Sequence, residues 1–156
     1  MSKRLRAENR RLKEEVKTLR MLLADKVEEP TLTSSMDIVK RFTEKWPNVK
    51  QEEFWVILLD NKHKVMDELM VTKGTLNQSL VHPREVFSEA IKQRAAAIVL
   101  LHCHPSGDPA PSGQDIQITK RLRQVGDLVG IQVLDHIIIG GTDYHSMVDS
   151  DTMPNF

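Results

Sequence analysis

The residues best suited to chemistry lie in one short run, HCHPSGDPAPSGQD, at positions 102–115. His102 and His104 stand at the end of an apolar segment that we predict to be a strand. Side chains two residues apart on a strand point to the same face, so both imidazoles share one face and Cys103 points to the other. The spacing therefore predicts two imidazoles that reach a single metal ion, with Cys103 as a core thiol.

Asp115 is a candidate third ligand, because it lies in the first turn of the helix that we predict after the loop. Two nitrogens and one carboxylate oxygen suit Zn²⁺ with the fourth position open to water. A metal held in this way lowers the pKa of its water toward ~7, which makes a nucleophile at neutral pH. Non-haem Fe(II) oxygenases use the same ligand set, so iron stays open as the metal.

Ser112 and Asp115 also have a second interpretation. Their spacing is that of a capping box, in which two side chains satisfy backbone N–H groups at the start of a helix. The loop between the histidines and this helix is rich in Pro and Gly, and it would fix where the helix begins. Spacing alone leaves cap and ligand open, and one pair of residues can serve as both.

The rest of the chain alternates strand and helix patterns, which favours an α/β fold with a central sheet covered by helices. Apolar runs rich in β-formers predict strands, and runs that begin at Ser or Pro with apolar residues on one side predict helices. We predict a helix from Ser34 or Ser35 to about Trp46, strands at 54–60 and 64–72, a helix from Pro83, a strand at 95–104, a helix at 113–126, a strand at 131–139 and a weak strand near 144–148.

Asp135 and His136 interrupt the apolar strand predicted at 131–139. We interpret them as an internal hydrogen-bonded pair that can lie next to the metal ligands and orient them.

Length and composition limit the class of protein. A chain of 156 residues suits one domain with a core, and 22 Lys+Arg balance 22 Asp+Glu. This balance disfavours broad nucleic-acid binding, which depends on an excess of cations. The single cysteine excludes an internal disulfide and fits a reducing compartment. The N-terminus is charged from its third residue and no apolar run approaches the roughly 20 residues of a membrane span, so we expect a cytoplasmic protein with no signal peptide and no membrane association.

Residues 1–29 carry nine Lys/Arg and six Asp/Glu and contain no Gly or Pro, which predicts a charged helix. Leucines recur there every seven residues, as in a short leucine zipper, and an Asn at one core position favours parallel pairs in register. The pattern places Leu5, Leu12 and Leu19 at d, and Asn9, Val16 and Leu23 at a. We expect a homodimer through residues 1–28. The alternatives are a helix packed on its own domain and a solvated arm.

The composition divides the chain into three parts. The heptad helix takes residues 1–29, a single domain takes residues 30–150, and residues 151–156 form a loose tail. The stretch at 28–35 reads as a linker, because it holds Pro, Thr and Ser between two helical patterns.

The string HxHPSGDPxPSxxD, read from His102 to Asp115, resembles the JAMM motif of JAB/MPN metallopeptidases, and in particular the RadC-type branch. The segments at 74–91 and 134–140 are also similar to that branch, and the resemblance covers residues 33–150. Asn usually stands in this branch where the chain has Cys103. The resemblance implies a JAB/MPN-like (cytidine-deaminase-like) α/β fold, a mixed central sheet flanked by helices, here preceded by the N-terminal charged helix.

The resemblance also implies a role for each residue of the motif. His102, His104 and Asp115 would hold Zn²⁺. Ser112 would donate a hydrogen bond to the developing oxyanion or to the bound water.

A glutamate upstream of the motif would act as general base and then protonate the leaving amine. Aligned on Phe54 and Asp60, the family pattern Glu-x-Phe-x-x-Leu-x-Leu-Asp assigns this role to Glu52, with Glu53 held in reserve. Adjacent strand residues face opposite sides, so only one of the two glutamates reaches the metal. From spacing alone, both would be interpreted as a solvated pair at the start of a strand.

The function implied is that of a zinc-dependent peptidase or isopeptidase acting on an unidentified protein or peptide substrate. The alternative is a JAMM module that binds or regulates, without proteolysis, in DNA repair or recombination. Proteins of this type usually carry a helix-hairpin-helix-like domain where this chain has the charged helix. The resemblance therefore gives little support to direct DNA binding.

Overall fold

The structure is a computed structural model that describes residues 31–45, 51–74 and 81–155, and residues 8, 11–12, 14–16 and 18 of the N-terminal segment. The chain divides into two compact units, residues 1–30 and 31–156. The described residues of the first unit are helical. Of the six heptad core positions only Leu12 and Val16 are described, and both are exposed. The other four lie outside the described residues, so pairing through this helix stays a prediction.

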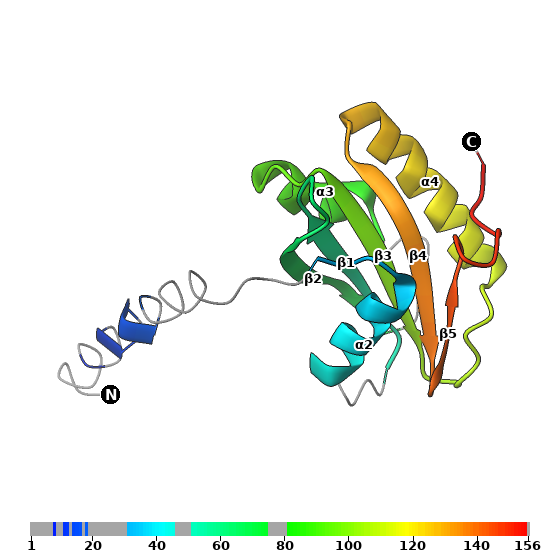
Figure 1. Cartoon of the computed structure of the whole chain (residues 1–156), viewed down its shortest axis with the longest axis horizontal. Coiled ribbons are helices and arrows are strands. Elements are labelled where there is room, and N and C mark those ends of the chain that lie inside the picture. The colour runs from blue at the N-terminus through cyan, green and yellow to red at the C-terminus, as the bar shows by residue number, and fades with distance from the viewer. Residues whose placement is uncertain are drawn as a thin grey trace. The chain divides into compact units, whose positions relative to one another are not determined.

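A mixed five-stranded sheet forms the centre of the second unit, in the order β2-β1-β3-β4-β5 (Figure 1). Strand β1 (Glu53–Leu59) pairs antiparallel with β2 (Val65–Lys73) and with β3 (Ala97–His104). Strand β3 pairs parallel with β4 (Gln132–Gly140), and β4 pairs antiparallel with β5 (Asp143–Ser146). The apolar runs of β1 and β3 are buried on both faces, as continuous apolar strands in a covered sheet should be.

Helices cover both faces of the sheet and enclose two apolar cores. Helix α2 (Ser35–Lys45) packs Ile38 and Phe42 on the face that carries Cys103. Helices α3 (Pro83–Lys92) and α4 (Gly113–Val129) pack on the opposite face, which carries Phe54. This confirms the expected mixed central sheet flanked by helices. The part of the chain that the structure describes contains no helix with the length and apolar character of a membrane span.

The predicted end of the last helix at Gly126 is wrong. Helix α4 continues to Val129 and ends at Gly130, whose φ of 75° provides the left-handed C-cap that glycine adopts readily. Gly126 lies inside the helix. A Cβ at this position would be 2.5 Å from the carbonyl oxygen of Ile131 and 3.3 Å from the ring of Phe87, so a side chain has no room there. Glycine at this position marks the close approach of α4 to its neighbours and does not stop the helix.

The predicted linker at 28–35 is also wrong in its second half. Thr31 forms an isolated antiparallel bridge with Lys64, and Leu32 is buried in the core under α2. Ser34 Oγ accepts a hydrogen bond from the Asp37 N–H at the start of α2. These residues therefore belong to the folded unit, because a single apolar side chain and one backbone bridge attach them to it.

Candidate metal centre

The candidate site lies where β3 ends and α4 begins. Strands β3 and β4 are parallel, so their carboxyl ends meet at the same edge of the sheet, with His104 paired with Gly140. The rings of His102 and His104 are 4.5 Å apart between centroids, and Cys103 packs in the core under α2. Burial raises the pKa of the Cys103 thiol to about 12, with a further contribution from Glu53. The two imidazoles therefore share a face, as the spacing predicts, while the thiol stays protonated on the other.

Asp115 is fully buried in the first turn of α4 and faces both histidines. Its Oδ1 lies 2.8 Å from His102 Nδ1, and its Oδ2 lies 3.6 Å from His104 Nε2. Burial raises the pKa of Asp115, but hydrogen bonds from His102 and Ser112 outweigh burial and hold the pKa well below its usual range. The carboxylate is therefore ionised at neutral pH, which is the state a metal ligand requires.

The hydrogen bonds of the two histidines determine which nitrogen carries the proton. Nδ1 of His104 lies 2.7 Å from the carbonyl oxygen of Asp108. A carbonyl oxygen only accepts, so Nδ1 of His104 donates and Nε2 presents its lone pair toward Asp115. Metal-binding histidines are commonly oriented by a bond of this kind from their other nitrogen.

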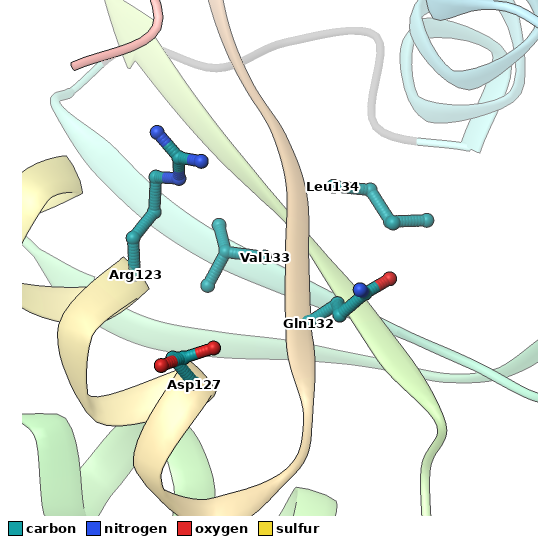
Figure 2. A pocket seen from close by; sticks show the side chains of 5 residues that line it. All are labelled: Arg123, Asp127, Gln132, Val133 and Leu134. Atoms are coloured by element: carbon teal, nitrogen blue, oxygen red, sulfur yellow. The ribbon is translucent and has the colours of Figure 1, made fainter. Parts of the chain in front are cut away.

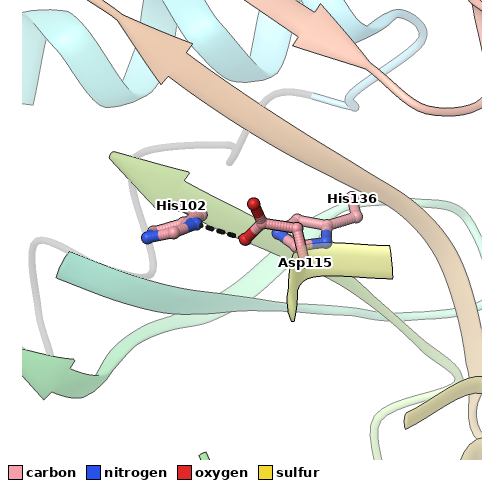
Figure 3. Close-up of side chains that lie close together, drawn as sticks. All are labelled: His102, Asp115 and His136. Atoms are coloured by element: carbon pink, nitrogen blue, oxygen red, sulfur yellow. Dashed lines mark hydrogen bonds and ion pairs between the residues drawn. The ribbon is translucent and has the colours of Figure 1, made fainter. Parts of the chain in front are cut away.

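His102 is oriented in the same way. Its Nδ1 donates to the ionised carboxylate of Asp115, so in the neutral ring the lone pair is on Nε2, which points away from Asp115 (Figure 3). That Nε2 is buried and has no hydrogen-bond partner among the described residues. A buried nitrogen without a partner is rare and calls for an explanation, and a bound cation is one.

Ser112 and Asp115 form the predicted capping box. Ser112 Oγ accepts a hydrogen bond from the Asp115 N–H at 3.2 Å, and the Ser112 N–H donates to Asp115 Oδ2 at 2.7 Å. The Ser112 hydroxyl also donates to Oδ2 at 2.5 Å. The capping interpretation is therefore confirmed. The same residues also place a carboxylate against the histidines, so the cap is compatible with Asp115 as a metal ligand.

His136 on β4 joins this cluster, and sequence reasoning gave it a lesser place. One ligand atom from each of His102, Asp115 and His136 lies within 4.8 Å of the other two, and all three residues are buried (Figure 3). Burial lowers the pKa of His136 to about 3, so its imidazole is neutral at pH 7. Imidazole nitrogens with one carboxylate are a donor set that suits zinc. These residues can therefore hold a divalent metal ion.

Asp135 and His136 are internal and hydrogen-bonded to each other, as predicted, but the bond is made by the His136 backbone and not by its ring. Asp135 Oδ1 accepts from the backbone N–H of His136, but its other bonds go to Ser146 Oγ and to the Val148 N–H. The His136 ring instead contacts Thr119 on α4. The physical reason is that adjacent residues on a strand point to opposite faces, so only His136 faces the site.

The two upstream glutamates lie on opposite faces of the sheet. Glu53 pairs with Cys103 across β1 and β3, while Phe54 pairs with His102. Glu53 is buried, accepts from Trp55 Nε1 at 3.0 Å and forms an ion pair with Lys73 at 3.2 Å. Glu52 precedes β1, and its carbonyl accepts from the Gly74 N–H, which extends the pairing of β1 with β2. By alternation Glu52 shares the face of Phe54 and His102, so register favours Glu52 over Glu53 for a role at the metal centre.

A hollow of about 270 Å³ lies elsewhere, beside the first residues of β4 and the later turns of α4 (Figure 2). It is lined by Arg123, Asp127, Gln132, Val133 and Leu134. Arg123 also bonds the carbonyl oxygen of Pro154. None of these residues belongs to the His–Asp cluster, and the volume lies just below the usual range for ligand pockets. We assign no function to this hollow.

The fold and the cluster define an α/β domain of the JAB/MPN type with a candidate metal centre at one edge of its sheet. Residues 32–152 match the RadC-like JAB domain, and the chain belongs to this family.

Several curated relatives share the name UPF0758 protein. The relative from Geotalea uraniireducens is 49% identical over 121 residues, which cover 78% of this chain and 53% of the relative. The one from Geobacter sulfurreducens is 48% identical over 118 residues, or 76% and 52%. The one from Staphylococcus haemolyticus is 48% identical over 130 residues, or 83% and 57%. The chain thus spans just over half the length of these relatives, whose shared name states no activity.

Proposed function

We propose that this chain is a zinc-dependent metallopeptidase or isopeptidase that hydrolyses an amide bond in a protein or peptide substrate with a metal-activated water. The observation that carries the proposal is the convergence of two imidazoles on one buried, ionised carboxylate. His104 donates from Nδ1 to the Asp108 carbonyl, which leaves its Nε2 facing Asp115, while His102 faces the same carboxylate with Nδ1. A cation bound between these groups would contact the buried carboxylate and both imidazoles, with His102 as a ligand through Nδ1 or after its ring turns.

His102, His104 and Asp115 would hold the ion. Bound zinc supplies an acidified water and a Lewis acid that polarises the substrate carbonyl. His102 and Asp115 are buried, whereas His104 retains some exposure at the end of β3. Substrate would therefore approach from the side of His104, over the loop that follows β3.

Glu52 would move the protons of the reaction. It is partly exposed one residue before β1, where strand alternation from Phe54 would put it on the face of His102. Its carboxylate would accept a proton from the attacking water and deliver it to the nitrogen of the leaving amine. General acid–base catalysis of this kind contributes typically 10²–10⁴-fold to a rate.

Ser112 would stabilise the oxyanion. It is exposed at the N-cap of α4, and its hydroxyl now donates to Asp115 Oδ2. When the hydroxyl turns to a substrate oxyanion, the Ser112 N–H still donates to the same carboxylate oxygen at 2.7 Å. The carboxylate of Asp115 thus keeps its orientation while the hydroxyl is used.

The test of this proposal is a metal-dependent cleavage assay. Wild-type protein is stripped with a chelator, divided, and half is reloaded with one equivalent of zinc. Both halves are incubated with a library of linear and isopeptide-linked peptides, and newly formed amino groups are identified by mass spectrometry. We expect cleavage by the zinc-loaded protein, none by the stripped protein, and none by zinc-loaded Glu52→Gln.

Two results would count against this function. Cleavage that persists in the stripped sample would show a reaction that needs no metal. A zinc-loaded protein that cleaves neither class of peptide would instead favour the non-proteolytic JAMM module, with the same residues holding a structural ion.

A further inference from the structure

His136 lies at the base of the candidate metal centre and has no role in the proposed mechanism. It is fully buried on β4, where it pairs with Leu100 of β3 in the parallel register. Its ring is 6.3 Å from the ring of His102 between centroids, in a stacked orientation. His136 is thus placed against one of the motif histidines by the pairing of β3 with β4.

The hydrogen bonds around Thr119 fix the tautomer of His136. Thr119 lies one turn after Asp115 on α4, and its hydroxyl donates to the Asp115 carbonyl oxygen at 2.5 Å. That single hydroxyl proton is then used, so the contact of 2.6 Å between Thr119 Oγ1 and His136 Nδ1 has Nδ1 as the donor. Nε2 of His136 therefore carries a lone pair.

That lone pair has no partner among the residues that the structure describes, although Nε2 is buried. Folded proteins leave few buried polar atoms unpaired. A metal ion is the partner suited to a neutral imidazole nitrogen that is oriented by a bond from its other nitrogen. The bond to Thr119 gives His136 this orientation, as the bond to Asp108 gives it to His104.

The separation of the groups is close to what a metal centre requires. Atoms of His102, Asp115 and His136 lie within 4.8 Å of one another. Two ligands on a tetrahedral zinc ion, each at about 2.05 Å, are about 3.3 Å apart. His102 faces Asp115 with Nδ1. His102 would therefore lose that proton or turn its ring, and small shifts of Asp115 and His136 would then bring the three groups onto one ion.

We propose that His136 is a further protein ligand of the metal ion, so that three imidazoles and the Asp115 carboxylate hold it. This inference rests on the metal site of the proposed function and enlarges its ligand set. Zinc expands to five ligands at catalytic sites, so a fourth protein ligand is compatible with a bound water.

X-ray absorption on tag-free, zinc-loaded wild-type protein tests this directly, because multiple scattering counts imidazole ligands. We expect three imidazoles in the wild type and two in His136→Gln. Zinc affinity, measured by competition with a chromophoric chelator, should fall at least tenfold in His136→Gln. His145→Ala is the matched control, since His145 bonds Thr152 outside the cluster, and it should leave both measurements unchanged.

A second variant separates a ligand from a residue that only supports the ligands. Thr119→Val removes the acceptor of the Nδ1 proton but keeps the imidazole, so we expect three imidazoles with a smaller loss of affinity. Two imidazoles in the wild-type protein would overturn the inference, even if His136→Gln failed to fold. An unchanged imidazole count and affinity in folded His136→Gln would also overturn it.

The outcome separates this inference from the proposed function. Wild-type protein that binds zinc through two imidazoles and cleaves peptides in a Glu52-dependent manner would refute the role of His136 alone. Wild-type protein that binds no zinc would refute both.

Discussion

Gly140 lies beside His104 in the parallel register of β3 and β4, and its missing side chain leaves space for the loop that follows β3. A Cβ on Gly140 would lie 2.6 Å from Pro109 N and 2.7 Å from the carbonyl carbon of Asp108. The Asp108 carbonyl in turn accepts from His104 Nδ1. Glycine at position 140 thus lets residues 107–109 pack close to β4. The Asp108 carbonyl of this loop then orients the ring of His104, a candidate metal ligand.

Gly140→Ala should therefore weaken metal binding without touching a ligand. The methyl group would push residues 107–109 outward and break the bond that orients His104. We expect zinc affinity to fall at least tenfold, as for other residues that support metal ligands, and stability to fall by about 1–3 kcal/mol through overpacking. Gly113→Ala is the matched control, because a Cβ there meets nothing within 4 Å, and it should bind zinc normally. Equal zinc affinity in the two variants would refute this role of the loop.

The glutamate pair offers a second matched comparison. Glu52→Gln should retain zinc and thermal stability yet lose 10²–10⁴-fold in hydrolysis, because the amide cannot accept the proton. Glu53→Gln should keep full activity and lose about 1 kcal/mol of stability, since its ion pair with Lys73 lies on the other face. Rate assays and thermal unfolding of both variants decide the matter. Full activity in Glu52→Gln would remove it from the mechanism.

Ser112 should show two separable effects. Ser112→Ala removes the hydroxyl that caps α4, which costs about 1 kcal/mol of stability. If the hydroxyl also serves the oxyanion, the hydrolysis rate should fall by about 10²–10³-fold with little change in KM. Ser112→Thr keeps a hydroxyl and should restore most of both. A Ser112→Ala variant that loses the cap stability but hydrolyses at the wild-type rate would leave Ser112 as a cap only.

The N-terminal segment carries a prediction of its own. If the heptad helix pairs two chains, deletion of residues 1–28 should convert a dimer to a monomer, as measured by light scattering. The folded unit that begins at Thr31 keeps both of its cores and should unfold at a similar temperature. A number of chains per particle that does not change on deletion would show that this helix does not hold a dimer together.

Local sequence patterns were enough to predict much of the fold and of the site. Alternation along β3 placed His102 and His104 on one face and Cys103 on the other, and the structure has them so. The spacing of Ser112 and Asp115 predicted the capping box. These features depend only on residues within one strand or at the start of one helix. Spacing along the sequence can predict contacts over such short distances.

The features that sequence reasoning missed depend on contacts between distant elements. His136 reaches the site because a register shift between Ile98 and Val99 brings it opposite Leu100. A parallel register of this kind leaves no local pattern. The choice of Glu52 over Glu53 was made from the sequence, and the pairing of β1 with β3 adds the register, with Glu53 opposite Cys103 and Phe54 opposite His102. The position of Thr119 near the site could have been predicted, since it lies four residues after Asp115 on the same face of the helix.

The most direct test of the account is metal analysis of purified, tag-free protein. Wild-type protein refolded with excess zinc and then dialysed should hold about one zinc ion per chain. His104→Ala, treated in the same way, should lose it while remaining folded, because His104 lies at the partly exposed end of β3. Wild-type protein that retains no zinc, or a His104→Ala variant that binds zinc as tightly as the wild type, would contradict the metal centre described above.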